Sequence, residues 1–157
     1  EMFLQASKII QSKGYNFQFQ IVGDGPLLNK MKKLANKLNL NGTSFLGYQE
    51  DLLPILTQSD LFVLTSKNEG FGRVIVESMA AGLPVVATSV GGVPDIITKG
   101  ENGFLVPSGD VSQLTSAIIK LYNDRKLFNK ISKNNKRKAK KYSIDNYIDN
   151  IEIMYGN

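Results

Sequence analysis

Residues 61–88, LFVLTSKNEGFGRVIVESMAAGLPVVAT, contain the pattern that decides the fold. Residues 61–65 form a short apolar run that favours a strand, and the polar residues 66–72 include two glycines, which is typical of a loop. Apolar residues at helical spacing follow and end at Gly82, a residue that favours a helix C-terminus. Residues 85–87 are apolar again. Two apolar strands joined through a helix predict a βαβ unit, and therefore a parallel sheet.

The glycine-containing loop at residues 69–72 is a candidate binding site for an anion. It lies at the predicted carboxyl end of a strand, which is where ligands of βαβ units bind. Unpaired N–H groups at the start of the next helix, together with the positive end of the helix dipole, favour a phosphate there. Gly70 and Gly72 have no Cβ, so a ligand can approach the backbone closely.

Two carboxylates flank this loop, because Glu69 precedes the helix and Glu77 lies about a turn and a half inside it. At roughly 3.6 residues per turn, their separation predicts that they lie on a similar side of the helix. A carboxylate accepts two hydrogen bonds, which suits a pair of vicinal hydroxyls. A phosphate site between two such acids predicts a nucleotide-sugar pocket. The alternative interpretation is that Glu69 caps the helix and Glu77 is a solvated helix residue.

The rest of the chain continues the alternation of strands and helices. For 157 residues this predicts one α/β domain with a doubly wound parallel sheet of five strands, rather than a closed barrel. The expected strands are residues 17–23, 43–46, 61–65, 85–87 and 104–106. The expected helices are residues 1–13, 26–38, 51–58, 74–80, 94–99, 111–121, 125–141 and 144–155.

The composition excludes several kinds of chemistry. The sequence contains neither cysteine nor histidine, which excludes disulfides, thiolate nucleophiles, a Ser-His triad and the common zinc sites. The acidic residues do not cluster at metal-ligand spacing, and no P-loop lysine follows a glycine loop, so we expect neither a bound metal nor ATP hydrolysis. No apolar run is long enough to cross a membrane and no signal peptide opens the chain, which predicts a cytoplasmic protein.

Positive charge is concentrated near the C-terminus. The formal net charge is +5, yet residues 120–141 contain ten lysines or arginines against one acid, so the remainder has nine basic and thirteen acidic residues, a net charge of −4. The basic segment is interpreted as a solvated helix face, and contact with an anionic membrane surface is the alternative. We do not expect nucleic acid as a partner, because no aromatic platform accompanies the charge. A non-catalytic membrane-surface module is therefore one rival function.

An NAD-binding oxidoreductase domain is the other rival function. Residues 23–25, Gly-Asp-Gly, follow a predicted strand and resemble the start of the dinucleotide fingerprint G-x-G-x-x-G. However, Leu28 stands at the third glycine position, and no acid closes the next predicted strand at residues 43–46, where a ribose-binding carboxylate is expected.

The central stretch resembles a known family. Residues 69–77, EGFGRVIVE, are similar to the E-x7-E signature of the retaining glycosyltransferases called glycosyl transferases group 1 (family 4). The resemblance covers nearly the whole chain, in the family's order and spacing. The other matching segments are residues 22–26, 45–48, 78–97 and 102–106. The resemblance implies that residues 1–157 are a piece of a longer enzyme, namely the Rossmann-like C-terminal half of a GT-B fold with extra C-terminal helices.

The resemblance also implies roles for individual residues. Glu77 would bind the ribose hydroxyls of a nucleotide, and Glu69 would contact hydroxyls of the transferred sugar as the catalytic residue. Gly70 and the backbone of Phe71, Gly72 and Arg73 would meet the sugar and diphosphate, with Val74 against the nucleoside. Tyr48 and Gln49 would line the base. The other implied donor-binding residues are Gly23, and Gly91 and Gly92 of the neighbouring loop.

The implied reaction transfers a sugar from a UDP- or GDP-sugar to a glycan, lipid-linked or other acceptor, with retention of configuration, in polysaccharide biosynthesis. It would need no metal, because a helix N-terminus and basic side chains hold the leaving diphosphate. The acceptor would bind an N-terminal domain outside this chain, with the enzyme in the cytoplasm or at the inner face of the membrane.

The chain also departs from the family's pattern. The family's first C-domain strand, which normally sits mid-sheet, is absent together with its following arginine and lysine, and Asp95 replaces the usual glutamate. The resulting hypothesis is that this piece is not active alone.

Overall fold

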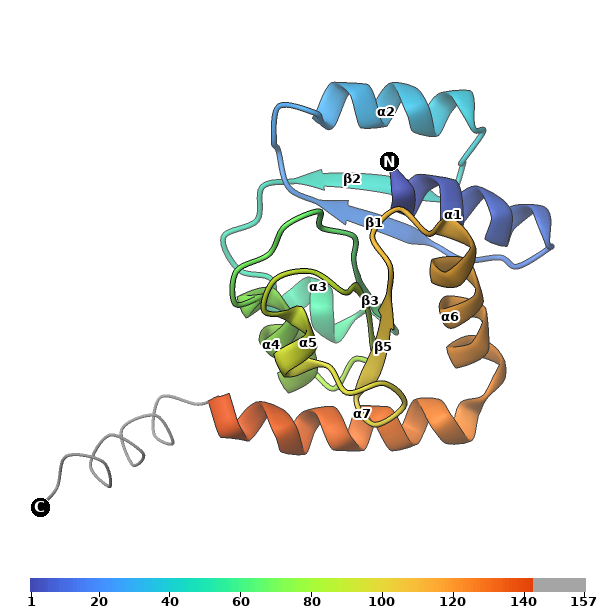
Figure 1. Cartoon of the computed structure of the whole chain (residues 1–157). Helices are drawn as coiled ribbons and strands as arrows, with labels where there is room; N and C mark the ends of the chain where they lie inside the picture. Colours follow the sequence, from blue (N-terminus) through green and yellow to red (C-terminus); the bar gives the residue numbers. More distant parts are fainter. Residues whose placement is uncertain (143–157) are drawn as a thin grey trace, which may run out of the picture.

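A computed structural model gives the fold of this protein and describes residues 1–142 (Figure 1). Strands and helices alternate along the chain, as the sequence predicts; the helix expected at residues 144–155 lies outside the described residues. The strands are β1 (Phe19–Val22), β2 (Thr43–Gly47), β3 (Phe62–Leu64), β4 (Val85–Thr88) and β5 (Gly103–Val106). The helices are α1 (Met2–Ser12), α2 (Leu28–Lys37), α3 (Leu53–Thr57), α4 (Arg73–Ala80), α5 (Val93–Ile96), α6 (Val111–Asn123), α7 (Arg125–Ala139) and the 3₁₀ helix η1 (Lys140–Tyr142).

All strand pairs of the described residues are parallel, but they form two sheets instead of one. β1 pairs with β2, and β4 lies between β3 and β5. The Phe19 N–H donates to the Gly42 carbonyl on the β2 side, and the Phe62 N–H donates to the Pro84 carbonyl on the β4 side. Because backbone groups of a parallel strand alternate between its two neighbours, β1 and β3 each keep one unpaired edge.

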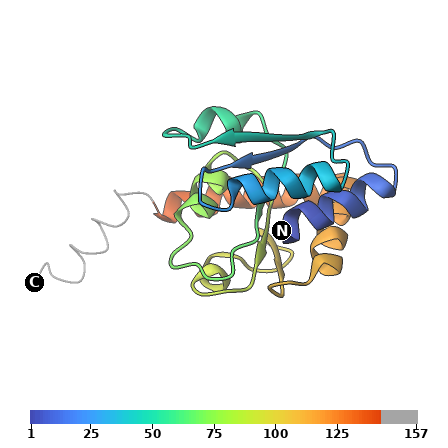
Figure 2. The same ribbon diagram turned by 90° about the horizontal axis from the view of Figure 1, so that it is seen from above.

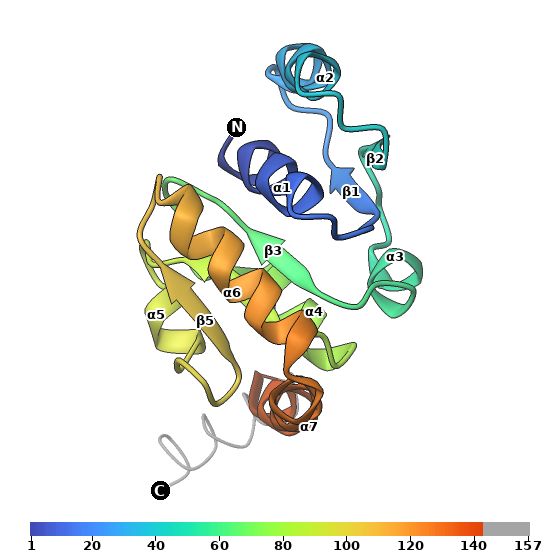
Figure 3. The ribbon, with the colours of Figure 1, turned by 90° about the vertical axis from the view of Figure 1, so that its right-hand side faces the viewer.

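Helices cover both faces of the three-stranded sheet, which confirms the doubly wound arrangement (Figure 3). The four residues of β4 are all buried, and successive side chains point to opposite faces. Val86 packs in a core with residues of α1 and α6, whereas Val85 and Ala87 pack in a second core with residues of α4 and α5. A third core lies between α2, α1 and the β1–β2 sheet, and Figure 2 shows α1 and α2 side by side there.

Helix α7 lies along one side of the molecule and is fixed by three side chains that donate to backbone carbonyls (Figure 1). Asn134 Nδ2 donates to Glu101 O and Asn135 Nδ2 donates to Leu83 O, each at 2.6 Å. Lys138 Nζ donates to Ile96 O at 2.6 Å. These bonds join α7 to the turns before β4 and β5 and to the end of α5.

The start of α6 provides a first test of the fold. Asp110 Oδ1 accepts from the Gln113 backbone N–H, and Gln113 Nε2 donates to Asp110 Oδ2, both at 2.8 Å. We expect Asp110→Ala to lower the free energy of unfolding by about 1 kcal/mol, because it removes the N-cap. Asp110→Asn keeps an acceptor and is the control. Thermal unfolding measures the stability of both variants, and an equal loss of stability in the two would contradict a capping role for Asp110.

Candidate functional site

The loop between β3 and α4 holds the first carboxylate of the predicted site. Glu69 Oε2 accepts a hydrogen bond from Ser66 Oγ at 3.1 Å. The N-cap of α4 is Gly72, which has a left-handed backbone with φ of 74°, and no side chain caps this helix. The interpretation of Glu69 as a helix cap is therefore wrong. Glu69 is half-buried in the loop, and its Oε1 has no hydrogen-bond partner among residues 1–142.

The start of α4 leaves several backbone donors without partners. The first amide of this turn with an acceptor is Ile75 N, which donates to Gly72 O at 2.8 Å. Within the part of the chain that the structure describes, no group accepts from the N–H groups of Phe71, Gly72, Arg73 or Val74. Unpaired N–H groups at a helix N-terminus form a binding site for a phosphate.

Glu77 lies on α4 and forms an ion pair within the helix. Arg73 Nε lies 3.1 Å from Glu77 Oε1, and the two side chains are 89% and 37% exposed. The sequence argument used helical periodicity to relate Glu77 to Glu69, and that argument is wrong. α4 begins at Arg73, so the loop conformation and the left-handed Gly72 set the position of Glu69.

The loop that follows β4 packs directly on the loop that contains Glu69. Gly92 N donates to Gly70 O at 3.0 Å and to Glu69 O at 3.3 Å. A Cβ built on Gly91 would overlap Glu69 O, and one on Gly92 would overlap Gly70 O. Thr88 Oγ1 donates to Ser66 O at 2.6 Å. The predicted residues of these two loops are therefore in contact, and the glycines permit that contact.

The remaining predicted residues lie at the carboxyl end of the β1–β2 sheet. Gly23 N donates to Gly47 O at 2.7 Å, which holds the ends of the two strands together. Tyr48 is 70% exposed, and Gln49 Nε2 donates to Leu46 O at 2.8 Å. No hydrogen bond among residues 1–142 joins this second group to the Glu69 loop. The structure thus places the predicted residues in two groups, one at each sheet.

Sequence reasoning missed two residues beside the site. Tyr142 contacts the half-exposed ring of Phe71, with ring centroids 5.9 Å apart. Burial raises the pKa of the Tyr142 hydroxyl, and the Asp95 carboxylate raises it further, so this hydroxyl is protonated at neutral pH. Phe71 and Tyr142 are 71 positions apart in the sequence, so no local sequence pattern indicated their contact. The second missed residue is Ser66, whose spacing of three positions before Glu69 could have indicated their hydrogen bond.

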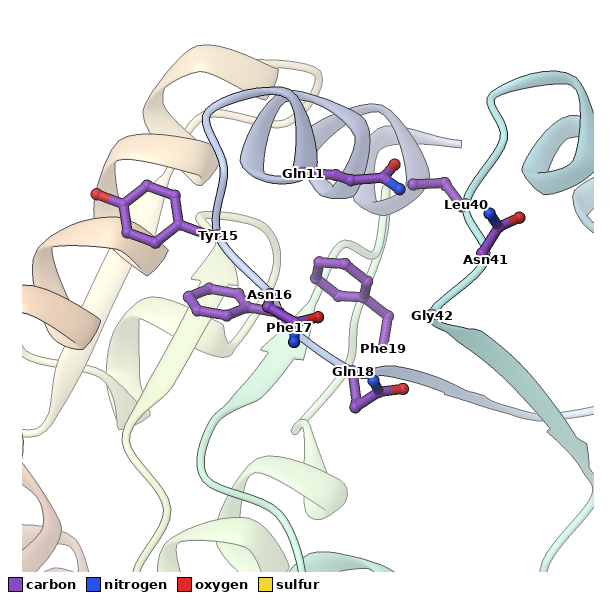
Figure 4. Close-up of a pocket in the computed structure, with 9 residues that line it drawn as sticks. All are labelled: Gln11, Tyr15, Asn16, Phe17, Gln18, Phe19, Leu40, Asn41 and Gly42. Carbon is purple, nitrogen blue, oxygen red and sulfur yellow. The ribbon is translucent and has the colours of Figure 1, made fainter.

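Two pockets among the described residues lie away from this loop. Figure 4 shows one at the amino ends of β1 and β2, lined by aromatic and amide side chains such as Phe17, Phe19 and Gln18. It contains no carboxylate and no lysine or arginine, so it does not fit a diphosphate. The other lies between α7 and the turn before β5, lined by Glu101, Asn102, Asn134, Arg137, Lys138 and Lys141.

Two further searches of the described residues were negative. Residues 1–142 contain no group of three acidic side chains that could hold a metal ion. Within the same range, none of the helices has the length and apolar character needed to span a membrane.

Comparisons with known proteins agree with the resemblance. Residues 1–138 match the family described as glycosyl transferases group 1. The capsular polysaccharide biosynthesis glycosyltransferase CapM of Staphylococcus aureus is 32% identical over 156 residues, which cover 97% of this chain and 41% of CapM. The chain thus spans less than half the length of this relative.

Two solved structures show the same fold. The C-terminal domain of the glycosyl transferase group 1 protein LpcC from Francisella tularensis is 29% identical, with a TM-score of 0.78 over 91% of this chain and 78% of that domain. Anabaena HepE in complex with UDP and glucose is 29% identical, with a TM-score of 0.78 over 87% of this chain and 39% of HepE. This chain has the α/β fold of a GT-B C-terminal domain and belongs to the glycosyl transferases group 1 family.

Proposed function

We propose that this chain is the donor-binding half of a retaining glycosyltransferase that uses a UDP- or GDP-sugar. The observation that carries the proposal is the unpartnered row of N–H groups at Phe71–Val74, which lies between Glu69 and Glu77. Such amides suit a diphosphate, and the two carboxylates suit hydroxyls of a sugar and a ribose. The similarity to HepE, whose structure contains UDP and glucose, supports this assignment.

The contacts of the two carboxylates suggest how the donor binds. Ser66 holds Oε2 of Glu69, so Oε1 can accept a hydrogen bond from a hydroxyl of the transferred sugar. Glu77 is partly exposed beside the amide row and binds the ribose hydroxyls in our proposal, with Val74 against the nucleoside and Tyr48 and Gln49 at the base. The loop of Gly91 and Gly92 keeps the Glu69 loop in place for this task.

The rest of the enzyme is proposed to lie outside this chain. An N-terminal half would bind a glycan or lipid-linked acceptor, and a parallel strand from it or from a connecting segment would pair with the unpaired edges of β1 and β3. The reaction retains anomeric configuration and needs no bound metal in this proposal, because the helix N-terminus and basic side chains hold the leaving diphosphate. We assign it to polysaccharide biosynthesis, as the name of CapM suggests, and we propose that the reaction takes place in the cytoplasm.

A nucleotide titration of the full-length protein tests this function against NAD binding. We expect UDP or GDP to raise the melting temperature, because a ligand at about 100 times its Kd stabilises the folded state by about 2.7 kcal/mol. NAD is expected to produce no shift, since Leu28 interrupts its fingerprint. Stabilisation by NAD alone would contradict the proposal.

Turnover tests the hypothesis that this chain is only half of the enzyme. The full-length protein should transfer sugar from a nucleotide-sugar, whereas residues 1–157 alone should not. Robust sugar transfer by residues 1–157 alone would contradict the expected inactivity of the isolated chain, but not the proposed activity of the full-length protein.

A further inference from the structure

We infer that the exposed face of α7 binds an anionic lipid bilayer through a straight row of cations, which is a function separate from donor binding. The row consists of Lys126, Lys130, Lys133 and Arg137 of α7 and Lys141 of the following η1, all exposed. Their spacings of four, three, four and four positions place them on one helix face. At 1.5 Å per residue the row is about 22 Å long. We call it the α7 row.

The opposite face of the same helix fixes the direction in which the α7 row points. Ile131, Asn135 and Ala139 are buried and occur at four-residue spacing, half a turn away from the row. Figures 1 and 3 both show α7 at the periphery of the molecule, with the sheets and the other helices on one side of it. The row therefore faces outward along the whole length of the helix.

Among residues 1–142, no carboxylate forms an ion pair with the α7 row. Among residues 1–142, Lys30 pairs with Glu1 and Arg73 pairs with Glu77, and neither pair involves a residue of the row. Asp124 is the one acid between residues 120 and 141, and its side chain caps α7 by accepting from Leu127 N at 2.9 Å. Residues 120–141, which contain the α7 row, hold ten basic residues against one acid, whereas the rest of the chain has a net charge of −4.

A shallow pocket beside the row suits the headgroup phosphate of a lipid. Arg137 and Lys141 line it together with Lys138, Asn102 and Asn134, and Glu101 of the turn before β5 is the one acid against these three cations. Burial lowers the pKa of Lys138, whose Nζ already donates to Ile96 O. Arg137 and Lys141 are exposed and can therefore donate to phosphate oxygens at this point.

The shape of the surface favours a bilayer over nucleic acid. A row on a single convex helix meets a plane at all of its positions, which is the geometry of an anionic membrane surface. Single-stranded nucleic acid binds grooves that offer aromatic rings for stacking. Two aromatic rings of α7 and η1 are already engaged, because Phe128 packs against the core beneath the Arg125 guanidinium and Tyr142 packs on Phe71.

Docking along the α7 row would also orient the candidate site. The helix continues through η1 to Tyr142, whose ring contacts Phe71 in the donor loop. The C-terminal end of the row is therefore close to the unpartnered amides of α4. A molecule bound to a bilayer through α7 would hold that loop near the membrane surface.

Vesicle sedimentation of the full-length protein tests this inference. We expect binding to phosphatidylcholine vesicles that contain about 30 mol% phosphatidylglycerol, and little binding to phosphatidylcholine alone. Replacing all five cations of the row with glutamine should weaken partitioning at least about tenfold, because each cation near an anionic surface contributes to binding. About 0.5 M NaCl should have a similar effect on the wild type, since salt screens exposed charges.

Two matched variants control for total charge and for side-chain length. Replacing Lys8, Lys13, Lys32, Lys33 and Lys37 with glutamine removes the same charge elsewhere and should leave vesicle binding nearly unchanged. Replacing the four lysines of the row with arginine keeps the charge and should preserve binding. Thermal unfolding with and without UDP checks that every variant is folded and reports donor binding separately.

Three results would overturn the inference. In the first, the glutamine variant of the row binds anionic vesicles as well as the wild type does. In the second, the charge-matched control loses as much vesicle binding as the row variant. In the third, the protein binds a DNA duplex but not anionic vesicles at the same salt concentration. A protein that binds anionic vesicles through the row but does not bind UDP or GDP would overturn the proposed function and leave this inference standing.

Discussion

Replacing Gly91 with alanine is expected to destabilise the protein by about 2–5 kcal/mol and to weaken donor binding at least about tenfold. Two costs combine at this position. Gly91 has φ of 50°, where a side chain is strained, and its added Cβ would overlap the Glu69 carbonyl oxygen. The Glu69 carbonyl oxygen belongs to the backbone and cannot rotate away from the added Cβ as a side chain could. The Glu69 loop must therefore move, and the amides at the start of α4 move with it. The melting temperature and UDP titration measure the two effects.

Alanine substitutions at two other glycines distinguish the effect of backbone strain from the effect of Cβ overlap. Gly109 has φ of 89° and open space around its Cα, so Gly109→Ala should cost about 1–2 kcal/mol without changing UDP affinity. Gly92→Ala adds a Cβ that overlaps Gly70 O at an ordinary φ of −79°, so it should weaken UDP binding through the overlap alone. If Gly91→Ala behaved like Gly109→Ala, contact between the two loops would not control the donor site.

Replacing Glu77 with glutamine is expected to weaken UDP binding by roughly ten- to a hundredfold. A hydrogen bond to a charged group contributes about 1.5–3 kcal/mol, and the proposed ribose contact depends on this carboxylate. The stability should hardly change, because the exposed pair with Arg73 contributes only about 0.3–0.5 kcal/mol. Isothermal titration measures the affinity, and thermal unfolding measures the stability.

The control for Glu77 is Glu101, an acid of the same size outside the β3–α4 loop and outside α4. Glu101 is exposed in the turn before β5, so Glu101→Gln removes one negative charge without touching the proposed site. UDP affinity should be unchanged in this variant. If Glu77→Gln left the affinity intact as well, Glu77 would be only the surface partner of Arg73, which is the alternative that the sequence left open.

Features set by neighbouring residues were predictable from the sequence. Helix spacing, the stop at Gly82 and the strand before Glu69 all depend on contacts within a few positions, and the structure confirms them. The parallel sheets follow from the connections, since a strand that returns through a helix must run in the same direction.

Contacts between distant residues were not predictable in this way. Gly92 and Gly70 are far apart in the sequence, and only the placement of β3 beside β4 brings their loops together. The Phe71–Tyr142 contact depends on the path of α7 past the sheet. The helical argument for Glu69 failed for a related reason, because a left-handed Gly72 changes the chain direction before α4 begins.

The inner face of α7 defines the smallest unit that can fold as this domain. Asn134 and Asn135 supply hydrogen bonds to the carbonyls of Glu101 and Leu83, and Ile131 fills the main core. A shortened protein that stopped after α6 would leave these carbonyls to water and open a hole beneath the sheet. Engineered domain swaps within this family should therefore place their junction beyond α7.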